Sequence, residues 1–392
     1  MTFTSAQSNR LPDRLHTMNS FRRALPHSLS RIALALAAVL SLGFDADAAA
    51  RKMLVITQSR GFVHNPVRRP APDQLCLVEQ TLHELGTKTG LFTTVNSQNA
   101  IEALTSENLA RFDAVFFYTT GILLPSGTPR EALTDFVKSG KAFLGTHSAT
   151  DTFHGSGKEA FMDYVQMING SFNGHPWGAG TTCTFANHEP SHPVVAMFGP
   201  EFQWKDEIYQ YNNYDGKAVR VLFSLDMAKT NPKRPYLVPV CWVREFGSGR
   251  LFYTNLGHND ATWKEPKFHE HLLAGFKWAT RQLDGPAAPN PAVQQAHNDH
   301  SIVAYAAALA GKEAAPFLVK AKSSAAWLAG VKAAADAAAK AQDAVGAIRD
   351  PDAKKTKPEE LDAQRAAAKE KRTAAQAKFD EEKQKLVVAL EK

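Results

Sequence analysis

Cysteine is scarce in this chain, which has three among 392 residues. Cys76, Cys183 and Cys241 are far apart and form no Cys-x-x-Cys pair, so the sequence contains no dithiol motif. Two states are possible in an oxidising compartment: one disulfide with one free thiol, or three buried free thiols. None of the three stands in a context typical of a catalytic thiol.

A long apolar run is also missing. Residues 32–42 are apolar but number only about a dozen, which is too few to favour a membrane span. Arg22, Arg23 and Arg31 precede this run, and Ala46-Asp47-Ala48 after it has the Ala-x-Ala form of a cleavage site. The pattern predicts a signal peptide over residues 1–48, cleaved near Ala48, and a periplasmic or secreted chain without a transmembrane span. An uncleaved anchor is the alternative.

The main part of the chain has no excess of charge of either sign. The net charge of +6 comes from the two ends, because residues 49–311 carry 23 basic and 23 acidic residues. A neutral middle gives no argument for nucleic-acid binding, so no nucleic-acid partner is expected. The extra positive charges after residue 311 are interpreted as a solvated helix face.

Short apolar segments alternate with helical patterns in the first half of the chain. Strands are predicted at 53–57, 92–95, 114–118 and 142–144. Asp73 is the expected N-cap of a first helix, and Thr128-Pro-Arg-Glu131 has the form of a capping box before another. Strands that alternate with helices predict right-handed crossovers and a doubly wound, mostly parallel α/β sheet.

The pattern changes after residue 170, where Gly, Asn, Pro and aromatic residues become frequent. Shorter strands follow, and they predict an antiparallel extension of the sheet with long loops. Helices are expected before and after this part. The predicted strands are 182–186, 219–225, 238–244 and 251–254, with a hairpin loop at 245–249 and helices at 158–168 and 266–283.

The C-terminal part is expected to be separate. Residues 49–284 form the predicted main domain, residues 285–299 a linker, and residues 300–392 an Ala/Lys-rich helical tail. Helices at 321–348 and 360–391 predict an antiparallel α-helical hairpin. The tail is expected to bind a partner, to self-associate or to act as an envelope-associated arm, and it shows no chemistry of its own.

One strand leads into the most informative turn of the chain. In Lys141-Ala-Phe-Leu-Gly-Thr-His-Ser-Ala-Thr-Asp151 an apolar run ends at Gly145, and His147 follows in the turn. Such turns project side chains into the crevice at the carboxyl ends of parallel strands. The nucleophile elbow of hydrolases has this plan, but His147 stands where it would have Ser or Cys.

Other ionisable side chains follow strand ends and are expected at the same crevice. Imidazole and carboxylate groups bind divalent ions and also act as general acids and bases. Metal-activated water is one mechanism, and proton transfer by His147 and Glu207 without metal is the other. His154, His188, His192 and His269 are interpreted as surface residues, and Asp206-Glu207 as either a solvated pair or a half-buried site. The candidates are His64, His147, Asp151, His154, His175, Asp206, Glu207, Tyr209 and His258.

A series of motifs follows in order along the chain. The motifs are Gly61-Phe-Val-His64, Tyr118-Thr-Thr-Gly121, Gly145-Thr-His-Ser-Ala-Thr-Asp-Thr152, Gly170-Ser-Phe-Asn-Gly-His-Pro176, Trp204-Lys-Asp-Glu-Ile-Tyr209 and the segment from Pro239 to His258. Together they resemble the trehalose-utilisation (ThuA-like) family. The resemblance covers about residues 51–283 and leaves out the predicted signal peptide and the tail.

This resemblance implies a flavodoxin-like fold of the class I glutamine amidotransferase-like superfamily. It implies a link to disaccharides and keto-glycosides, and a divalent metal such as Zn or Mn at His147, Glu207 and His258. No nucleotide cofactor is expected, and glutamine hydrolysis is not expected because the elbow Cys is absent. His147, Glu207 and Tyr209 are the predicted catalytic residues. The predicted substrate-binding residues are His64, Thr120, Asp151, His175 and Trp204.

Three functional hypotheses follow. The first is an exported hydrolase, lyase or isomerase that acts on a sugar or glycoside. The second is a non-catalytic sugar-binding or scaffold protein on the same fold. The number of ionisable groups favours the first, because a sugar binder needs mainly amides and aromatic rings. The third makes the tail the active part and the main domain its sensor.

Overall fold

The computed structural model describes residues 50–155, 157–353 and 356–392. The predicted signal peptide lies outside these residues. No helix within the described ranges is both long and apolar enough to cross a membrane.

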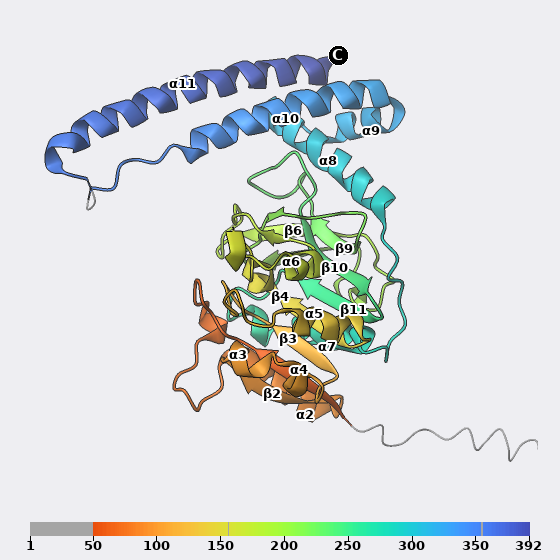
Figure 1. The fold of residues 1–392 in the computed structure, drawn as a ribbon. Helices are drawn as coiled ribbons and strands as arrows, with labels where there is room; N and C mark the ends of the chain where they lie inside the picture. The colour runs from red at the N-terminus through yellow and green to blue at the C-terminus, as the bar shows by residue number, and fades with distance from the viewer. Residues whose placement is uncertain (1–49, 156, 354–355) are drawn as a thin grey trace, which may run out of the picture. The chain divides into compact units, whose positions relative to one another are not determined.

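A nine-stranded sheet forms the main domain, in the order β2-β1-β3-β4-β11-β10-β9-β6-β7. Its neighbours from β2 to β11 are parallel and its neighbours from β11 to β7 are antiparallel. In Figure 1 the sheet extends from β2 near the bottom to β6 and β9 near the middle of the picture. The strands are β1 (Arg51–Ile56), β2 (Phe92–Ser97), β3 (Ala114–Phe117), β4 (Ala142–Thr146), β6 (Thr182–Asn187), β7 (Glu201–Lys205), β9 (Arg220–Leu225), β10 (Pro239–Phe246) and β11 (Gly249–Thr254).

The parallel half has the strand order of flavodoxin-like folds, so the predicted α/β class with an antiparallel extension is confirmed. A second, two-stranded sheet pairs β5 (Ser171–Phe172) with β8 (Tyr211–Asn212). The helices of this domain are α2 (Leu77–Thr89), α3 (Ala100–Ala103), α4 (Ser106–Leu109), α5 (Glu131–Lys138), α6 (Met162–Ile168) and α7 (Pro266–Ala279). The 3-10 turns are η1 (Asn65–Val67), η2 (His147–Asp151), η3 (Gly157–Glu159), η4 (Ala196–Phe198) and η5 (Thr262–Lys264).

Helices cover both faces of the parallel half, which explains why its strands are apolar throughout. Along β1, Met53 and Val55 belong to the apolar cluster that includes residues of α2 and α7. Leu54 and Ile56 belong to the opposite cluster, which includes residues of α3, α5 and α6. Because successive side chains of a strand point to opposite faces, one apolar run supplies both halves of the core.

Several predicted boundaries and one open alternative are corrected by the structure. Helix α2 begins after Cys76 rather than at Asp73, because the Glu79 carboxylate accepts from the Cys76 N–H and completes a capping box. Helix α5 begins only at Glu131, the last residue of the predicted box at 128–131. Helix α6 begins at Met162 and not at residue 158. All three cysteines are free and buried, so no disulfide forms.

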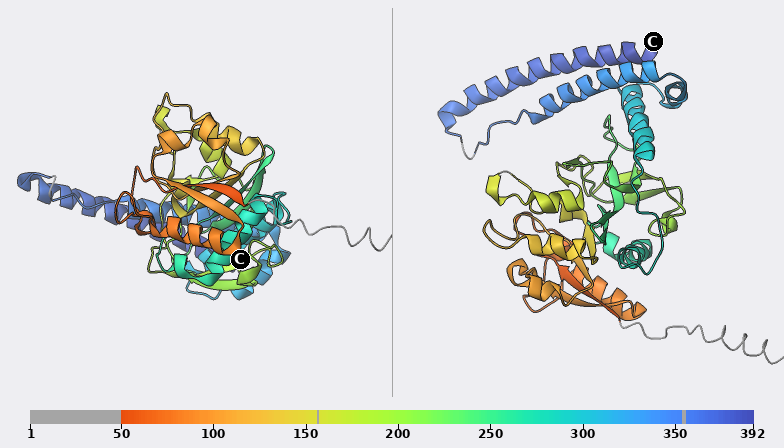
Figure 2. Two further views of the ribbon diagram at one scale, coloured as in Figure 1. Left: turned by 90° about the horizontal axis from the view of Figure 1, so that it is seen from below. Right: turned by 45° about the vertical axis from the view of Figure 1, so that its right-hand side comes forward.

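The C-terminal part contains α8 (Pro291–Leu309), α9 (Ala315–Ser323), α10 (Ala325–Ala347) and α11 (Pro358–Glu391). Helix α8 begins inside the segment 285–299 that the sequence assigned to a linker. Helices α10 and α11 lie side by side as the predicted antiparallel hairpin (Figures 1 and 2). Ile302 of α8, Val331 of α10 and Leu386 of α11 share one small apolar cluster. Most of the other members of this cluster are alanine, which agrees with the composition of the tail.

Candidate metal centre

The turn after β4 places His147 at the carboxyl edge of the sheet. His147 is fully buried and has a φ of 43°, in the left-handed region that side chains other than glycine rarely adopt. Such backbone strain persists only where the surroundings hold it, and it is concentrated at functional sites. The predicted elbow is therefore present, with an imidazole at its strained position.

The orientation of the His147 ring follows from one hydrogen bond. Its Nδ1 lies 2.9 Å from the backbone oxygen of Asn255. Because a carbonyl oxygen can only accept, Nδ1 carries the proton and Nε2 presents a lone pair. This Nε2 lies 3.2 Å from His258 Nδ1 and 3.7 Å from Glu207 Oε1. One backbone carbonyl therefore directs a basic nitrogen toward two further groups.

His258 and Glu207 reach the same point from loops after β11 and β7. Their nearest atoms, His258 Nδ1 and Glu207 Oε1, are 3.2 Å apart. The second carboxylate oxygen of Glu207 lies 3.3 Å from Nδ1 of His175, whose side chain is about half exposed. Burial opposes a charge on His258, but the hydrogen bond and negative charge of Glu207 raise its pKa above the ordinary value.

His64, from the loop after β1, completes the group. Its ring centroid lies 4.9 Å from that of His147 and 5.1 Å from that of His258. Its Nε2 is 3.4 Å from the Tyr209 hydroxyl, and its buried Nδ1 has no hydrogen-bond partner among the described residues. Burial, followed by the charge that His258 and His175 would carry, lowers the pKa of His64 to about 3. Burial likewise places the pKa of His147 well below its ordinary value.

The donor set fits a divalent ion. One ligand atom from each of His64, His147, Glu207 and His258 lies within 4.8 Å of all the others. Two ligand atoms bound to one tetrahedral Zn²⁺ are roughly 3.3 Å apart, given the usual bond lengths. The contacts of His258 Nδ1 to His147 Nε2 and to Glu207 Oε1 are both 3.2 Å. Neutral imidazoles with one carboxylate are ordinary ligands for Zn²⁺ or Mn²⁺, and the unpartnered His64 Nδ1 suits an ion as its partner.

Asp206 holds the backbone of the loops that carry Glu207 and His258, a role that the sequence did not reveal. Its carboxylate accepts from the N–H groups of Glu207, Gly257 and Asn259 at 2.7–3.1 Å. It also accepts from the Thr262 hydroxyl at 2.9 Å. Asp206 is fully buried, and burial raises its pKa to about 6 although these donors oppose the rise. The solvated-pair interpretation of Asp206-Glu207 is therefore wrong.

Tyr209 and Asn255 join the ligand segments to one another. The Tyr209 N–H donates to Asn255 Oδ1 at 3.2 Å, and the Asn255 backbone oxygen orients His147. Burial, with the nearby charge of Glu207, raises the pKa of Tyr209 well above its ordinary value, so its phenol stays protonated. In the sequence, Asn255 was marked only by its place in the motif from Pro239 to His258.

The remaining predicted residues are distributed around the centre. Thr120 is buried and holds the loop before His64, because its Oγ1 accepts from the Gly61 N–H and donates to the Phe62 oxygen. Asp151 pairs with His154 and not with the four central groups. Trp204 donates to Thr262 and packs near Phe198. Two histidines assigned to the surface, His188 and His192, are instead packed against other residues: His192 is buried, and the His188 ring contacts the His297 ring at a tilt of 48°.

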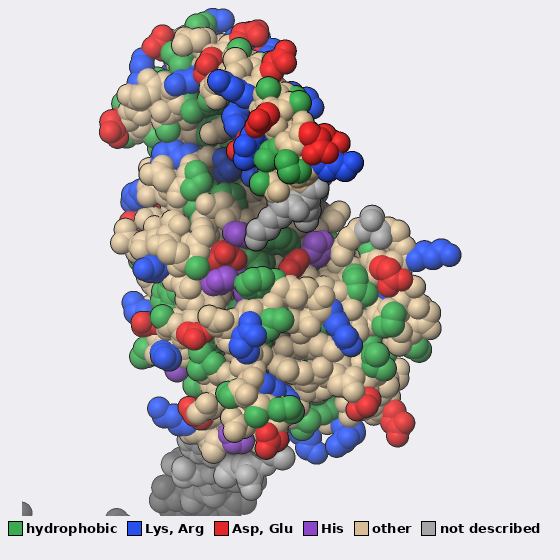
Figure 3. Space-filling view, turned by 90° about the vertical axis from the view of Figure 1, so that its left-hand side faces the viewer, with side chains coloured by type: hydrophobic (Ala, Val, Ile, Leu, Met, Phe, Trp, Pro, Cys, Tyr) green, Lys and Arg blue, Asp and Glu red, His purple; other side chains and the backbone are tan. Residues whose placement is uncertain are grey.

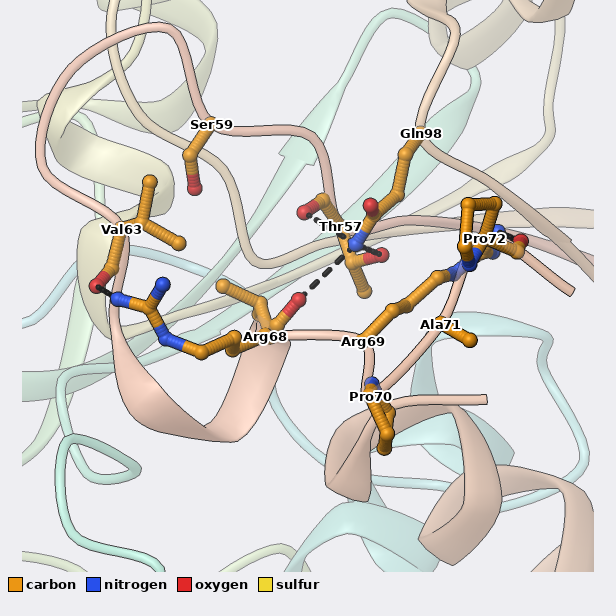
Figure 4. A pocket seen from close by; sticks show the side chains of 10 residues that line it. Thr57, Ser59, Val63, Arg68, Arg69, Pro70, Ala71, Pro72 and Gln98 are labelled. Atoms are coloured by element: carbon orange, nitrogen blue, oxygen red, sulfur yellow. Dashed lines mark hydrogen bonds between the residues drawn. The ribbon is translucent and has the colours of Figure 1, made fainter. Parts of the chain in front are cut away.

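Two cavities flank the loop that carries His64. The first, about 620 Å³, borders the centre at His258, and Figure 3 shows histidine and acidic side chains gathered in a hollow on one face. The second, about 510 Å³, is drawn in Figure 4. There the Arg69 guanidinium is paired with buried Glu79, and the Gln98 amide donates to the Val67 oxygen. These side chains stabilise the loop, and only the first cavity reaches the centre.

The fold and site define a flavodoxin-like α/β protein with a histidine–carboxylate cluster at the carboxyl edge of its sheet. The family described as trehalose utilisation (ThuA) matches residues 52–279. The chain belongs to this family.

Solved structures of low identity were also found, and a comparison with curated proteins found no match. A putative ThuA-like protein from Bacteroides uniformis is 18% identical over 60% of this chain and 95% of its own, with a TM-score of 0.48. One from Parabacteroides merdae is 16% identical over 62% and 99%, with a TM-score of 0.46. A cytoplasmic protein from Salmonella typhimurium is 13% identical over 61% and 99%, with a TM-score of 0.41.

Proposed function

We propose that this protein is a metal-dependent enzyme acting on a disaccharide or keto-glycoside. The observation that carries the proposal is the convergence of His64, His147, Glu207 and His258 within 4.8 Å. They come from four separate loops, and a pure sugar binder has no need of such a group. The family description, trehalose utilisation, supports a sugar as substrate.

The residues have different roles in this proposal. His147 acts as a ligand rather than as a general base, because it is fully buried and its ring is held by Asn255. The ion, when bound, supplies Lewis-acid activation of water or of a sugar oxygen. His175, half exposed and 3.3 Å from Glu207, is placed to exchange a proton with a substrate at the mouth of the site. Tyr209 keeps its proton and orients His64.

Metal content is the first test. Elemental mass spectrometry of the purified chain should find close to one Zn or Mn per molecule, and His147→Ala should lose it. His83→Ala, which removes an exposed imidazole on α2, is the matched control and should keep the metal. If neither the wild-type chain nor the control holds metal after incubation with Zn²⁺ and Mn²⁺, the metal-centred mechanism is wrong.

Turnover separates the enzyme from its alternative, a sugar-binding protein without catalysis. The metal-loaded chain should convert a disaccharide or its 3-keto form, detected by chromatography of the products. His147→Ala should reduce the rate by at least about a hundredfold, because even the loss of an outer-shell partner of a metal ligand costs up to about that much. Sugar binding with no conversion across the panel would favour the non-catalytic alternative.

We also propose that the protein is exported, on the basis of the N-terminal sequence pattern. N-terminal sequencing of protein from the periplasmic or secreted fraction should begin near Ala49. Retention in the cytoplasm with an intact N-terminus would contradict export and leave the proposed chemistry untouched.

A further inference from the structure

An aromatic ring stands exposed at the mouth of the metal centre. Phe62 is 67% exposed, and among the exposed large apolar side chains of the described residues only Val319 exceeds it. Its ring centroid lies only 4.8 Å from that of His64, in an edge-to-face arrangement. A single exposed phenylalanine is common on protein surfaces, but this one lies beside a candidate ligand and lines the cavity that contains His258.

The ring is held in place by its backbone. Thr120 accepts from the Gly61 N–H at 3.2 Å and donates to the Phe62 oxygen at 2.9 Å. The Arg60 N–H donates to the Thr120 oxygen at 2.8 Å. Three hydrogen bonds therefore hold the backbone from Arg60 to Phe62, which fixes the point from which the ring projects.

The cavity beside Phe62 has a mixed polar lining. At about 620 Å³ it is within the usual range of small-molecule sites. Lys205 and Asp260 line it, one of each charge, and His258 connects it to the metal centre. Asn259 uses both amide hydrogens on the backbone oxygens of Ala179 and Lys205, so its Oδ1 remains available to a ligand.

We infer that this cavity binds one uncharged glycosyl ring of the substrate, stacked on Phe62 beside His258. A sugar ring presents an apolar C–H face, which an aromatic ring covers, and a rim of hydroxyls, which amide, ammonium and carboxylate groups bind. The balance of Lys205 by Asp260 disfavours a phosphorylated sugar. This inference rests on the proposed function and names the substrate class and its binding residues.

The test is calorimetric titration of the zinc-loaded chain with trehalose, sucrose, cellobiose and trehalose 6-phosphate. Phe62→Ala should weaken binding of the best disaccharide by about tenfold, and Phe62→Tyr should restore most of it. Ile101→Ala, an exposed apolar residue on α3, is the control and should bind like wild type. Metal content and melting temperature should be equal in all four proteins, which separates stacking from a folding effect.

Each outcome decides something different. If wild type binds a disaccharide and Phe62→Ala binds it equally well, the subsite is wrong and the proposed function stands. If trehalose 6-phosphate binds more tightly than trehalose, the restriction to uncharged rings is wrong. If wild type holds metal and binds none of the sugars, the sugar part of the proposed function fails together with the subsite.

Discussion

Gly257 shows how closely the metal centre depends on single residues. It precedes His258, has a φ of +127°, and its N–H donates to Asp206 at 2.7 Å. A Cβ at this position would lie 2.9 Å from Oγ1 of Thr146, the buried residue before His147. Because Thr146 is itself tied to the Leu256 oxygen, it has little freedom to give way.

Gly257→Ala is therefore expected to lower stability by about 1–3 kcal/mol, from backbone strain and the close approach to Thr146. The movement of the backbone at residue 257 should also displace His258 and weaken metal binding. Metal affinity is measured by competition with a chromophoric chelator. Gly178→Ala is the control, since an added methyl there would meet nothing within 4 Å and the φ of Gly178 is not in the left-handed region. Equal metal affinity in the two variants would contradict the positioning role of this loop.

At the scale of elements, two histidines, His188 and His297, contact each other where α8 packs near the end of β6. His188 follows β6, and its ring centroid is 3.8 Å from that of His297 on α8. Its Nε2 is 2.9 Å from the Ser224 hydroxyl, and its Nδ1 has no hydrogen-bond partner in the described part of the chain. Burial, followed by the charge that His297 would carry, lowers the pKa of His188 to about 3.

This depressed pKa predicts a loss of stability in acid. The unfolded chain takes up the proton near pH 6.5 and the folded chain only near pH 3, so stability falls as pH decreases through that window. At pH 5 the loss from His188 is about 2 kcal/mol relative to pH 7.5. Burial also lowers the pKa of His297. Burial opposes a charge on Asp226, but its hydrogen bond with His300 helps to hold the pKa of Asp226 below the ordinary value.

Urea unfolding of wild type and His188→Gln at pH 7.5, 6.5, 5.5 and 5.0 isolates this effect. The stability difference between the two proteins should shift in favour of the variant by about 2 kcal/mol across the series. Titrations common to both proteins cancel in the difference. A difference that is constant with pH would show that His188 is not held neutral in the fold.

For the whole molecule, the boundary between domain and tail falls within α8, because its first half contacts the main domain and its second half packs in the apolar cluster of the tail. Asn290 at the start of α8 accepts from the Val221 N–H and donates to the Val221 oxygen, both at 2.9 Å. It thereby acts as a strand partner for β9 beyond the end of β6. Gln294 and Asn298 make further hydrogen bonds to backbone atoms of the main domain.

Two truncations test this boundary. Removal of residues 312–392 should leave metal content and sugar binding unchanged, because α9, α10 and α11 supply none of the four ligands. Removal of residues 286–392 should lower the melting temperature of the main domain, because the buried polar groups of Val221 lose their partners, at about 1–3 kcal/mol each. Loss of metal or sugar binding on removal of residues 312–392 would support the hypothesis that the tail is the active part.

Much of this architecture could be predicted from local patterns. The strand segments around 53–57, 114–118 and 142–144 are apolar throughout, and strands of that kind are buried on both faces. Because parallel strands place their carboxyl ends at one edge, the polar residues after them were expected together, and His147 and His258 do meet there. Local patterns were less reliable for helix starts. The Glu79 carboxylate that caps α2 also accepts hydrogen bonds from Arg69 and Thr57, which lie outside the helix, and a local pattern does not show these contacts.

The sequence by itself therefore determined the parallel strands around 53–57, 92–95, 114–118 and 142–144, the elbow and the set of ionisable residues at the sheet edge, because short-range periodicity and chain order are sufficient for these. The tertiary structure decided that the strand at 251–254, predicted in the antiparallel extension, instead pairs parallel with β4, and that residues 201–205 add β7 to the sheet. Only the tertiary structure decided that His64 joins His147, Glu207 and His258, that Asp206 is buried behind them, and that Trp204 packs elsewhere. These outcomes depend on contacts between residues more than fifty positions apart. Such contacts are determined by packing and hydrogen bonding across the whole domain, so local sequence patterns do not predict them.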